Sequence, residues 1–510
     1  MPPPITAPRR NAMAFAATAL LLAAPLHAAD PAPAAKAKAD STEAPIVTRH
    51  QISIAGKTLA YTVTTGKLPL KNETGETEAE IFFMAYTLDG VANRAARPLM
   101  FSFNGGPGSS SVWLHLGALG PRRVKMRPDG AMPPPPYQLV DNPHTWLDQT
   151  DLCFIDPVGT GYSRAAKPDL GKKFWGVQGD LESVGEFIRL YLSRYQRWSS
   201  PLFLVGESYG TTRAAGLAGY LVDRGIAFNG ILLVSSILNF ETARFARGNE
   251  LPYTLYLPTY TATAWYHKRL PADLQSRDLK SVLDEAEAWS GGDYARFLTL
   301  GSDATREQRT AALDQLARYT GLERRYLDLS DLRVPIQNFC KELMRAERRT
   351  VGRLDSRFTG VDDRAISETP EFDPSLAAIR PPYTAMLNQY VRGELGYKSD
   401  LTYHILGGGI GPWDWGSANS GFADVSGALR AAFSRNPDMR LFVASGYYDL
   451  ATPYFATGYT LGHLMLEPAE RARVMTREYE AGHMMYIHEG ELARLKRDVV
   501  EFVRGALAAK

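Results

Sequence analysis

The chain has 510 residues, of which 45% are hydrophobic and 22% are charged, and its formal net charge is +2 at pH 7. This composition is typical of a globular protein, and the length suffices for one catalytic domain with a sizeable insertion. So small a charge produces no field that would attract nucleic acid, and we expect no nucleic-acid partner.

Residues 1–29 have the features of a signal peptide. Arg9 and Arg10 form a basic start, and the apolar stretch at residues 13–26 is too short to span a bilayer. A signal anchor is the alternative. Residues 30–45 are rich in Ala, Pro, Lys and Asp, and we expect them to form a flexible linker. The leader predicts export to a periplasm or to the cell exterior, without stable membrane insertion after cleavage.

Residues 46–238 are predicted to form the first part of an α/β core. From residue 99 to residue 236, short apolar segments alternate with helical patterns such as residues 178–194, which favours a parallel sheet. Three earlier segments alternate polar and apolar residues, as antiparallel edge strands do. They are residues 50–54, 59–65 and 81–88.

A glycine-rich turn follows the strand predicted at residues 98–103. It begins with Asn104, Gly105 and Gly106. Glycines let the backbone come close to a bound anion, so that its N–H groups can donate hydrogen bonds. Phosphate binding is the alternative, but no Gly-Lys-Ser/Thr follows the turn. We predict that the N–H of Gly106 contributes to an oxyanion hole.

The pentapeptide Gly-x-Ser-x-Gly at residues 206–210 is the strongest catalytic signal. It follows a strand-like segment, residues 201–205, and precedes a helical stretch of small residues, 211–224. In that context the serine lies on a sharp strand-to-helix turn and its hydroxyl is exposed above the sheet. Ser208 is the predicted nucleophile, and the N–H of Tyr209 would complete the oxyanion hole. The alternative is a Gly-rich helix start that Ser208 merely caps.

A nucleophilic serine needs a base, and the base needs an orienting carboxylate. Asp449 follows a buried-strand pattern at residues 440–445, and His483 follows another at residues 474–479. The order Ser, Asp, His is that of α/β-hydrolases. We predict that His483 is the base and that Asp449 orients it. The alternative for Asp449 is a turn residue that bonds only to its own backbone. The alternative for the base is His488.

The alternation of strands and helices stops between residues 239 and 405. This segment is aromatic and helical, and we interpret it as a cap inserted into the core, which resumes at residues 406–510. Hydrolase caps close over the nucleophile and shape the substrate pocket. An aromatic cluster near the start of the cap is expected to line that pocket or to fill the cap's own core. It comprises Tyr253, Tyr256, Tyr260, Trp265 and Tyr266.

Cys153 and Cys340 are the two cysteines of the chain. Cys153 lies in an apolar run, so a buried free thiol is the default interpretation. Export would also permit a disulfide between the two, and the sequence leaves this open. So low a cysteine content argues against a disulfide-stapled eukaryotic secreted enzyme and favours a bacterial one.

Taken together, these motifs resemble the serine carboxypeptidase family. The resemblance implies an α/β-hydrolase fold and an enzyme that removes the C-terminal residue from a peptide, with no metal or cofactor. It also implies that Asn104 and Glu207 bind the carboxylate of the substrate. The matching motifs are residues 104–110, 119–121, 155–163, 206–210, Asp449 and residues 482–484.

The chain departs from the family pattern at four positions. Ser102 replaces a tryptophan, Ala118 a second carboxylate-binding glutamate, Ser109 a cysteine and Tyr447 an aspartate. The hydrolytic residues are therefore retained, whereas the carboxylate-binding network is half preserved. A broader serine hydrolase is one alternative function, and a non-catalytic binding protein is another. We expect peptide substrates, and the sequence does not indicate an oligomeric state.

Overall fold

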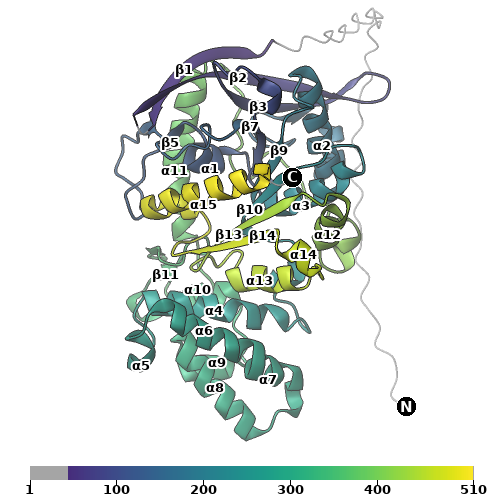
Figure 1. The fold of residues 1–510 in the computed structure, drawn as a ribbon. Helices are drawn as coiled ribbons and strands as arrows, with labels where there is room; N and C mark the ends of the chain where they lie inside the picture. Colours follow the sequence, from purple (N-terminus) through teal and green to yellow (C-terminus); the bar gives the residue numbers. More distant parts are fainter. Residues whose placement is uncertain (1–43, 55, 509–510) are drawn as a thin grey trace, which may run out of the picture. The chain divides into compact units, whose positions relative to one another are not determined.

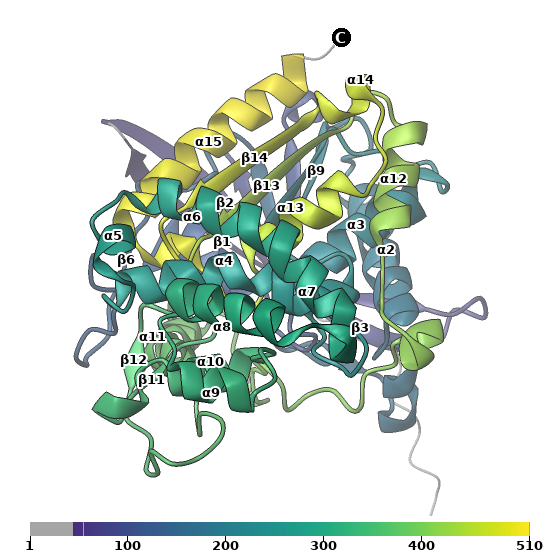
Figure 2. The same ribbon diagram turned by 90° about the horizontal axis from the view of Figure 1, so that it is seen from below.

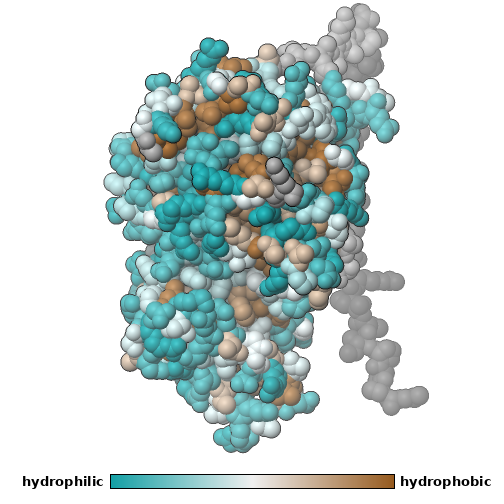
Figure 3. All heavy atoms as spheres, viewed as in Figure 1, coloured by the Kyte–Doolittle hydropathy of each residue, from teal (hydrophilic) through white to brown (hydrophobic). Residues whose placement is uncertain are grey.

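The computed structural model describes residues 44–54 and 56–508 (Figure 1). The predicted signal peptide, residues 1–29, and most of the predicted linker, residues 30–45, lie outside the described residues. Within the described part, no helix combines the length and the apolar character that a membrane span requires. On the face shown in Figure 3, hydrophilic residues dominate and hydrophobic residues are interspersed among them.

A ten-stranded mixed sheet organises the described part of the chain. The first three strands pair antiparallel, as predicted for the edge segments, and β3 also pairs antiparallel with β7. From β7 onward each strand is parallel to its neighbour. The order is β1 (Ile46–Ile54), β2 (Lys57–Lys71), β3 (Thr77–Leu88), β7 (Asp151–Ile155), β4 (Leu99–Phe103), β9 (Leu202–Ser208), β10 (Gly230–Ser236), β13 (Arg440–Gly446) and β14 (Val474–Tyr479), with β8 (Arg164–Ala165) beside β3.

Helices cover both faces of the sheet, because the central strands are apolar on both sides. In β9, Phe203 and Val205 belong to one hydrophobic core, and Leu202 and Leu204 belong to the other. Figure 2 shows α15 on one side of the strands and the helices of the second core on the other. The first core includes α11 (Pro374–Gln389) and α15 (Glu489–Ala508), and the second includes α2 (Val177–Arg194), α3 (Tyr209–Val222) and α12 (Ser426–Arg435). This is the predicted α/β-hydrolase architecture.

A group of helices between β10 and β13 has a hydrophobic core of its own. In Figure 1 these helices lie below the sheet. They are α4 (Leu251–Tyr266), α5 (Ala272–Gln275), α6 (Leu279–Trp289), α7 (Ala295–Leu300), α8 (Arg306–Thr320), α9 (Arg324–Leu329) and α10 (Ile336–Glu342). We call residues 251–342 the cap.

The rest of the segment predicted as cap has other surroundings. Two short strands, β11 (Thr350–Val351) and β12 (Thr359–Gly360), form a small antiparallel pair after α10. Helix α11 packs Tyr383 and Leu387 into the core of the sheet and not into that of the cap. The core of the sheet therefore includes residues before position 406.

Both cysteines are buried free thiols, and no disulfide joins them. Cys153 lies in β7, in the core of the sheet, and Cys340 lies in α10, in the core of the cap. Burial raises the pKa of both thiols well above the usual value. The free-thiol interpretation of Cys153 is confirmed, and the disulfide alternative is wrong, because the two residues belong to different cores.

Candidate active site

Ser208 is the last residue of β9, and α3 begins at the next residue. Its backbone has φ 60° and ψ −131°, a strained conformation for a residue with a side chain. The turn is tight enough to require glycine at both flanks. A Cβ at Gly206 would lie 2.1 Å from the carbonyl oxygen of Gly210, and a Cβ at Gly210 would lie 2.9 Å from that of Phe103. The sharp strand-to-helix turn predicted from the pentapeptide is present.

The glycine turn after β4 packs directly against this elbow. A Cβ at Gly105 would lie 2.4 Å from the backbone nitrogen of Tyr209. Gly106, Ser208 and Tyr209 line one cavity. Tyr209 is the first residue of α3, where backbone N–H groups have no acceptor within the helix. The structure thus brings together Ser208 and the two residues predicted to donate to an oxyanion.

His483 and Asp449 form a buried pair at the ends of β14 and β13. His483 Nδ1 lies 2.8 Å from Asp449 Oδ2. The same oxygen of Asp449 accepts a 2.7 Å hydrogen bond from Thr452 Oγ1, and Oδ1 accepts from the backbone N–H groups of Ala451 and Thr452 at 2.8 and 3.1 Å. These bonds fix the carboxylate that faces the imidazole. The alternative base, His488, directly precedes α15, and its buried Nδ1 has no hydrogen-bond partner in the described part of the chain.

The charge of Asp449 favours the protonated form of His483. Burial lowers the pKa of the imidazole, but the charge and the hydrogen bond of Asp449, together with the charge of Glu207, raise it more, so the pKa lies above its usual value. An imidazole held in this way can accept a proton and remain stabilised as the cation. Because β9, β10, β13 and β14 are consecutive parallel neighbours, Ser208, Asp449 and His483 all lie at or just after the carboxyl ends of one group of strands.

Thr452 connects this pair to the cavity. It lines the cavity with Ser208, and its hydroxyl lies 3.3 Å from His483 Nδ1. Sequence reasoning did not single out Thr452. Its position three residues after the aspartate is a recognisable signal, because an aspartate commonly accepts from backbone N–H groups two and three residues further on.

A segment outside the sheet holds the loops of both Asp449 and His483. The backbone N–H of Leu450 donates to Arg353 O at 3.1 Å, and that of His483 donates to Leu354 O at 2.6 Å. Asp355 accepts from the N–H of Gly482 at 3.2 Å and forms an ion pair with Arg357 at 2.7 Å. No sequence motif marks residues 353–357, since their role depends on contacts with loops about 100 residues away in the chain.

Asn104 and Glu207, the predicted carboxylate-binding residues, contact each other. Asn104 Nδ2 donates to Glu207 Oε1 at 2.9 Å, and its Oδ1 accepts from the N–H of Leu114 at 3.1 Å. Both side chains are buried, and neither is among the described residues that line the cavity at Ser208. Burial raises the pKa of the Glu207 carboxyl to about 7, although the charge of His483 and two hydrogen bonds oppose the rise. The carboxyl is therefore largely protonated at mildly acidic pH.

The second oxygen of Glu207 accepts a hydrogen bond from the hydroxyl of Tyr486. The ring of Tyr486 packs so closely on Gly117 that a Cβ there would lie 2.4 Å from it. Gly117 adjoins Ala118, where the family pattern has its second glutamate. Tyr486 thus supplies a partner for Glu207 from a different part of the chain. Sequence reasoning did not identify Tyr486, because nothing in its local pattern points to a residue 279 positions earlier.

The cavity at Ser208 has a volume of about 320 Å³, within the usual range for small-ligand sites. The sheet side contributes Gly106, Ser208, Tyr209 and Thr452. Of the predicted aromatic cluster, only Tyr256 lines this cavity. Further residues from other elements close the cavity. They include Ile237, Phe240, Arg244, Tyr256, Ile336 and Arg353. The aromatic cluster mainly fills the core of the cap, where Tyr260 stacks on Phe339 with ring centroids 3.9 Å apart.

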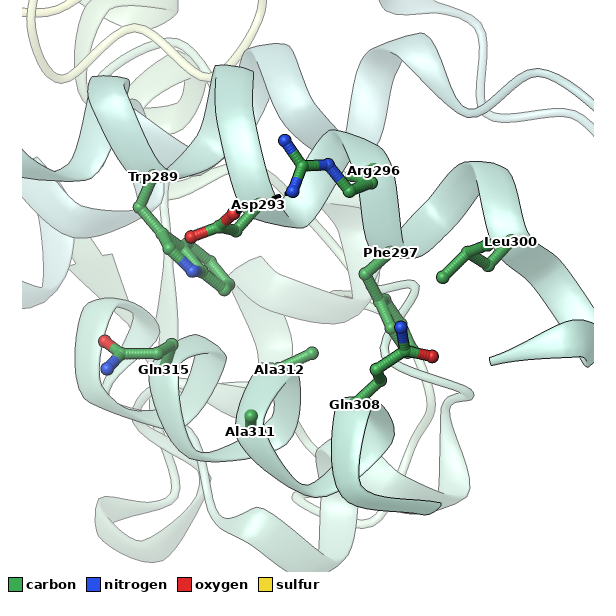
Figure 4. Close-up of a pocket in the computed structure, with 9 residues that line it drawn as sticks. All are labelled: Trp289, Asp293, Arg296, Phe297, Leu300, Gln308, Ala311, Ala312 and Gln315. Carbon is green, nitrogen blue, oxygen red and sulfur yellow. Dashed lines mark ion pairs between the residues drawn. The ribbon is translucent and has the colours of Figure 1, made fainter. Parts of the chain in front are cut away.

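A second cavity, of about 400 Å³, lies within the cap between α7 and α8 (Figure 4). Trp289 and Phe297 form apolar walls, and Asp293 and Arg296 form an exposed ion pair at 3.9 Å beside them. None of the residues predicted for catalysis lines it. Among the described residues, no cluster of His, Cys, Asp or Glu is arranged to hold a metal ion.

Comparison with known proteins gives consistent results. A family model described as "Serine carboxypeptidase" matches residues 60–350. Serine carboxypeptidase-like 5 of Arabidopsis thaliana is 32% identical over 153 residues, which cover 28% of this chain and 33% of that protein. Pheromone-processing carboxypeptidase KEX1 of Saccharomyces cerevisiae is 34% identical over 158 residues, 28% of this chain and 20% of that protein. The aligned region spans a third or less of the length of these relatives.

The crystal structure of KEX1ΔP, a prohormone-processing carboxypeptidase from Saccharomyces cerevisiae, has a similar fold. The TM-score is 0.51 at 16% sequence identity, and the match covers 87% of this chain and 91% of that one. The family match includes Ser208 but ends before Asp449 and His483. Since it extends over more than half of the sequence, the chain belongs to the serine carboxypeptidase family.

Proposed function

We propose that the protein is a serine-type carboxypeptidase that hydrolyses C-terminal residues from peptides. The observation that carries the proposal is the strained Ser208 elbow, which shares one cavity with Gly106 and Tyr209 and lies on the same edge of the sheet as the buried His483–Asp449 pair. Membership in the serine carboxypeptidase family supports this function.

The reaction would proceed through an acyl-enzyme. Ser208 Oγ attacks the carbonyl carbon of the C-terminal peptide bond while His483 accepts the hydroxyl proton, and Asp449 stabilises the imidazolium. The backbone N–H groups of Gly106 and Tyr209 donate to the oxyanion. Collapse of the tetrahedral intermediate breaks the C–N bond, and His483 returns the proton to the leaving amine. Water, deprotonated by His483, then hydrolyses the ester and restores Ser208.

Asn104 and Glu207 are the proposed ligands of the C-terminal carboxylate. A protonated Glu207 can donate a hydrogen bond to that carboxylate, whereas an ionised one repels it. The raised pKa of Glu207, about 7, keeps the donor form available at mildly acidic pH. Tyr486 supports the orientation of the Glu207 carboxyl in the absence of a second glutamate at position 118.

A broader serine hydrolase, such as an esterase or acyltransferase, is the second candidate function. It is favoured by one observation: Asn104 and Glu207 bond to each other and do not line the cavity at Ser208. A non-catalytic binding protein is a weaker alternative, because such a protein would have no need of a strained serine.

The test is a product assay with a matched inactive variant. The purified protein is incubated with an N-blocked peptide, and mass spectrometry follows release of the single C-terminal residue. In parallel, a fluorophosphonate probe reports the reactive serine. We expect release and labelling in the wild type, and loss of both in a folded Ser208→Ala protein. Labelling without release of the C-terminal residue would favour the broader hydrolase. The absence of both labelling and release would favour the binding protein.

Export to a periplasm or to the cell exterior completes the proposal and rests on the leader at residues 1–29. Cell fractionation of the full-length chain and of a chain without residues 1–29 tests it. We expect the full-length chain outside the cytoplasm in a shortened form, and the truncated chain inside.

A further inference from the structure

Two arginines line the cavity at Ser208. Arg353 lies just after β11, and Arg244 follows the short 3₁₀ helix η4 (Phe240–Ala243). Neither guanidinium forms an ion pair or a hydrogen bond with another residue in the described ranges. Of the residues lining the cavity in that part of the chain, none is an aspartate or a glutamate. The site of the proposed nucleophile therefore carries positive charge that the protein itself does not neutralise.

Other groups hold the backbone of Arg353 and the guanidinium of Arg244. The backbone N–H of Arg353 donates to Asp373 Oδ1 at 3.2 Å, and its carbonyl oxygen accepts from Leu450, next to Asp449, at 3.1 Å. The guanidinium of Arg244 lies 5.6 Å from the ring centroids of both Phe240 and Trp415. Such stacking on aromatic faces restricts a guanidinium while its N–H groups remain free to donate.

Both arginines line the cavity together with Tyr256. The hydroxyl of Tyr256 donates to the carbonyl oxygen of Ala451 at 3.4 Å. Burial and the charge of Asp449 raise the pKa of Tyr256, and the charges of Arg353 and Arg244 both oppose that rise. The charges of both arginines therefore act on the same part of the cavity.

The chemistry of this wall matches an acidic side chain. A guanidinium binds a carboxylate through paired N–H···O hydrogen bonds. Arg353 is half-buried and Arg244 is exposed, so the loss of such a bond leaves a partly buried charge without a partner only at Arg353. The apolar residues Ile237, Phe240 and Ile336 line the same cavity and would contact the methylene groups of a glutamate. A basic substrate side chain would be repelled.

We propose that Arg353 and Arg244 form a subsite for a carboxylate of the substrate, that of an acidic side chain next to the scissile bond. This inference rests on the proposed function, in which Asn104 and Glu207 take the C-terminal carboxylate. The protein is then a carboxypeptidase that prefers acidic peptides, and the two arginines determine its specificity.

Kinetics on matched peptides test the subsite. N-blocked peptides carry Glu or Gln at either of the two residues that flank the scissile bond, and each is made as a free acid and as a C-terminal amide. We expect the wild type to favour Glu over Gln at one of the two positions by about 10-fold or more in kcat/KM, mainly through KM. Arg353→Gln and Arg244→Gln should each reduce this ratio, and the double variant should bring it close to one. Arg353→Lys should retain part of it.

Arg247→Gln is the matched control, because Arg247 is exposed, three residues from Arg244, and outside the lining of the cavity. It should leave the Glu-to-Gln ratio unchanged. The amide series identifies the carboxylate that the arginines bind. If the arginine variants reduce only the preference for acids over amides, the subsite binds the C-terminal carboxylate and the side-chain assignment is wrong. An unchanged Glu-to-Gln ratio in the double variant overturns the proposal.

A binding experiment separates this inference from the proposed function. Calorimetric titration of the Ser208→Ala protein with the Glu and Gln peptides needs no turnover. Tighter binding of the Glu peptide, lost when Arg353→Gln and Arg244→Gln are added, supports the subsite even if no peptide is hydrolysed, and the hydrolase proposal alone then fails. Hydrolysis with equal affinity for both peptides refutes the subsite alone.

Discussion

The backbone N–H of His483 donates a hydrogen bond to the carbonyl oxygen of Leu354, with the two atoms 2.6 Å apart. The neighbouring residue, Arg353, accepts in the same way from Leu450, next to Asp449. A single segment outside the sheet therefore fixes the loops that carry the proposed base and its orienting acid. The precision of the His483–Asp449 pair depends on residues far from either in the sequence.

Asp355→Ala should destabilise the protein by about 3 kcal/mol, because it leaves the largely buried guanidinium of Arg357 without its carboxylate. It also removes the acceptor of the N–H of Gly482, the residue before the proposed base His483. Both the free energy of unfolding and kcat should therefore decrease. Urea unfolding and steady-state kinetics measure the two effects. Asp293→Ala, which removes an exposed pair with Arg296 in the cap, should cost at most about 1 kcal/mol. Equal losses in both variants would contradict the supporting role of Asp355.

Asp449→Asn should lower kcat by about 10⁴-fold, because the imidazole of His483 would then face an amide and lose its orienting charge. His483→Ala should cost a similar factor, and the double variant should lose little more, since the residues act as a unit. Rates are measured on folded protein, checked by circular dichroism. The control is His488→Ala, which should keep near-normal turnover; if it abolishes activity while His483→Ala does not, the base is misassigned.

Residues with strong local signals allowed most of the fold and of the proposed triad to be predicted. Gly206, Ser208 and Gly210 form a tight turn that few other residues could form, and continuous apolar runs identified the buried parallel strands. Asp449 and His483 were identifiable because each follows such a run. At the Ser208 turn and at the strand ends, the residues that the local conformation needs are also those that the folded structure uses.

The remainder of the site depends on contacts that no local pattern encodes. Tyr486 bonds to Glu207 from a position 279 residues later in the chain, and Arg353 reaches the cavity from a loop inside a segment predicted as helical cap. Helix α11 likewise has no sequence feature that assigns it to the core of the sheet and not to that of the cap. Tertiary packing decides such cases.

Glu207→Gln should flatten the alkaline limb of the pH profile for peptide acids. The pKa of Glu207 is raised to about 7, so its carboxyl is protonated below that pH and ionises above it, where it repels the substrate carboxylate. Glutamine cannot ionise. The measurement is kcat/KM against pH; an unchanged alkaline limb would remove Glu207 from substrate binding.

Tyr486→Phe should move the alkaline limb to higher pH. The hydroxyl of Tyr486 donates to Glu207 and lowers the pKa of that carboxyl. Burial raises this pKa, so loss of the hydroxyl should raise the pKa further. Tyr390→Phe is the matched control, because it removes a buried hydroxyl that bonds to Tyr86 in the same core. Its pH profile should equal that of the wild type. A shift of the same size in both variants would mean that general loosening of the core, and not the Glu207 contact, causes the effect.

A preference for free C-termini distinguishes a carboxypeptidase from a broader serine hydrolase, and a comparison of matched substrates measures it. The measurement compares kcat/KM for an N-blocked peptide acid and its C-terminal amide between about pH 4 and pH 9. We predict that the acid is the better substrate, with a preference that is largest below about pH 7 and shrinks as Glu207 ionises. Cleavage of the amide as fast as the acid at every pH would contradict the carboxypeptidase assignment and favour a broader serine hydrolase.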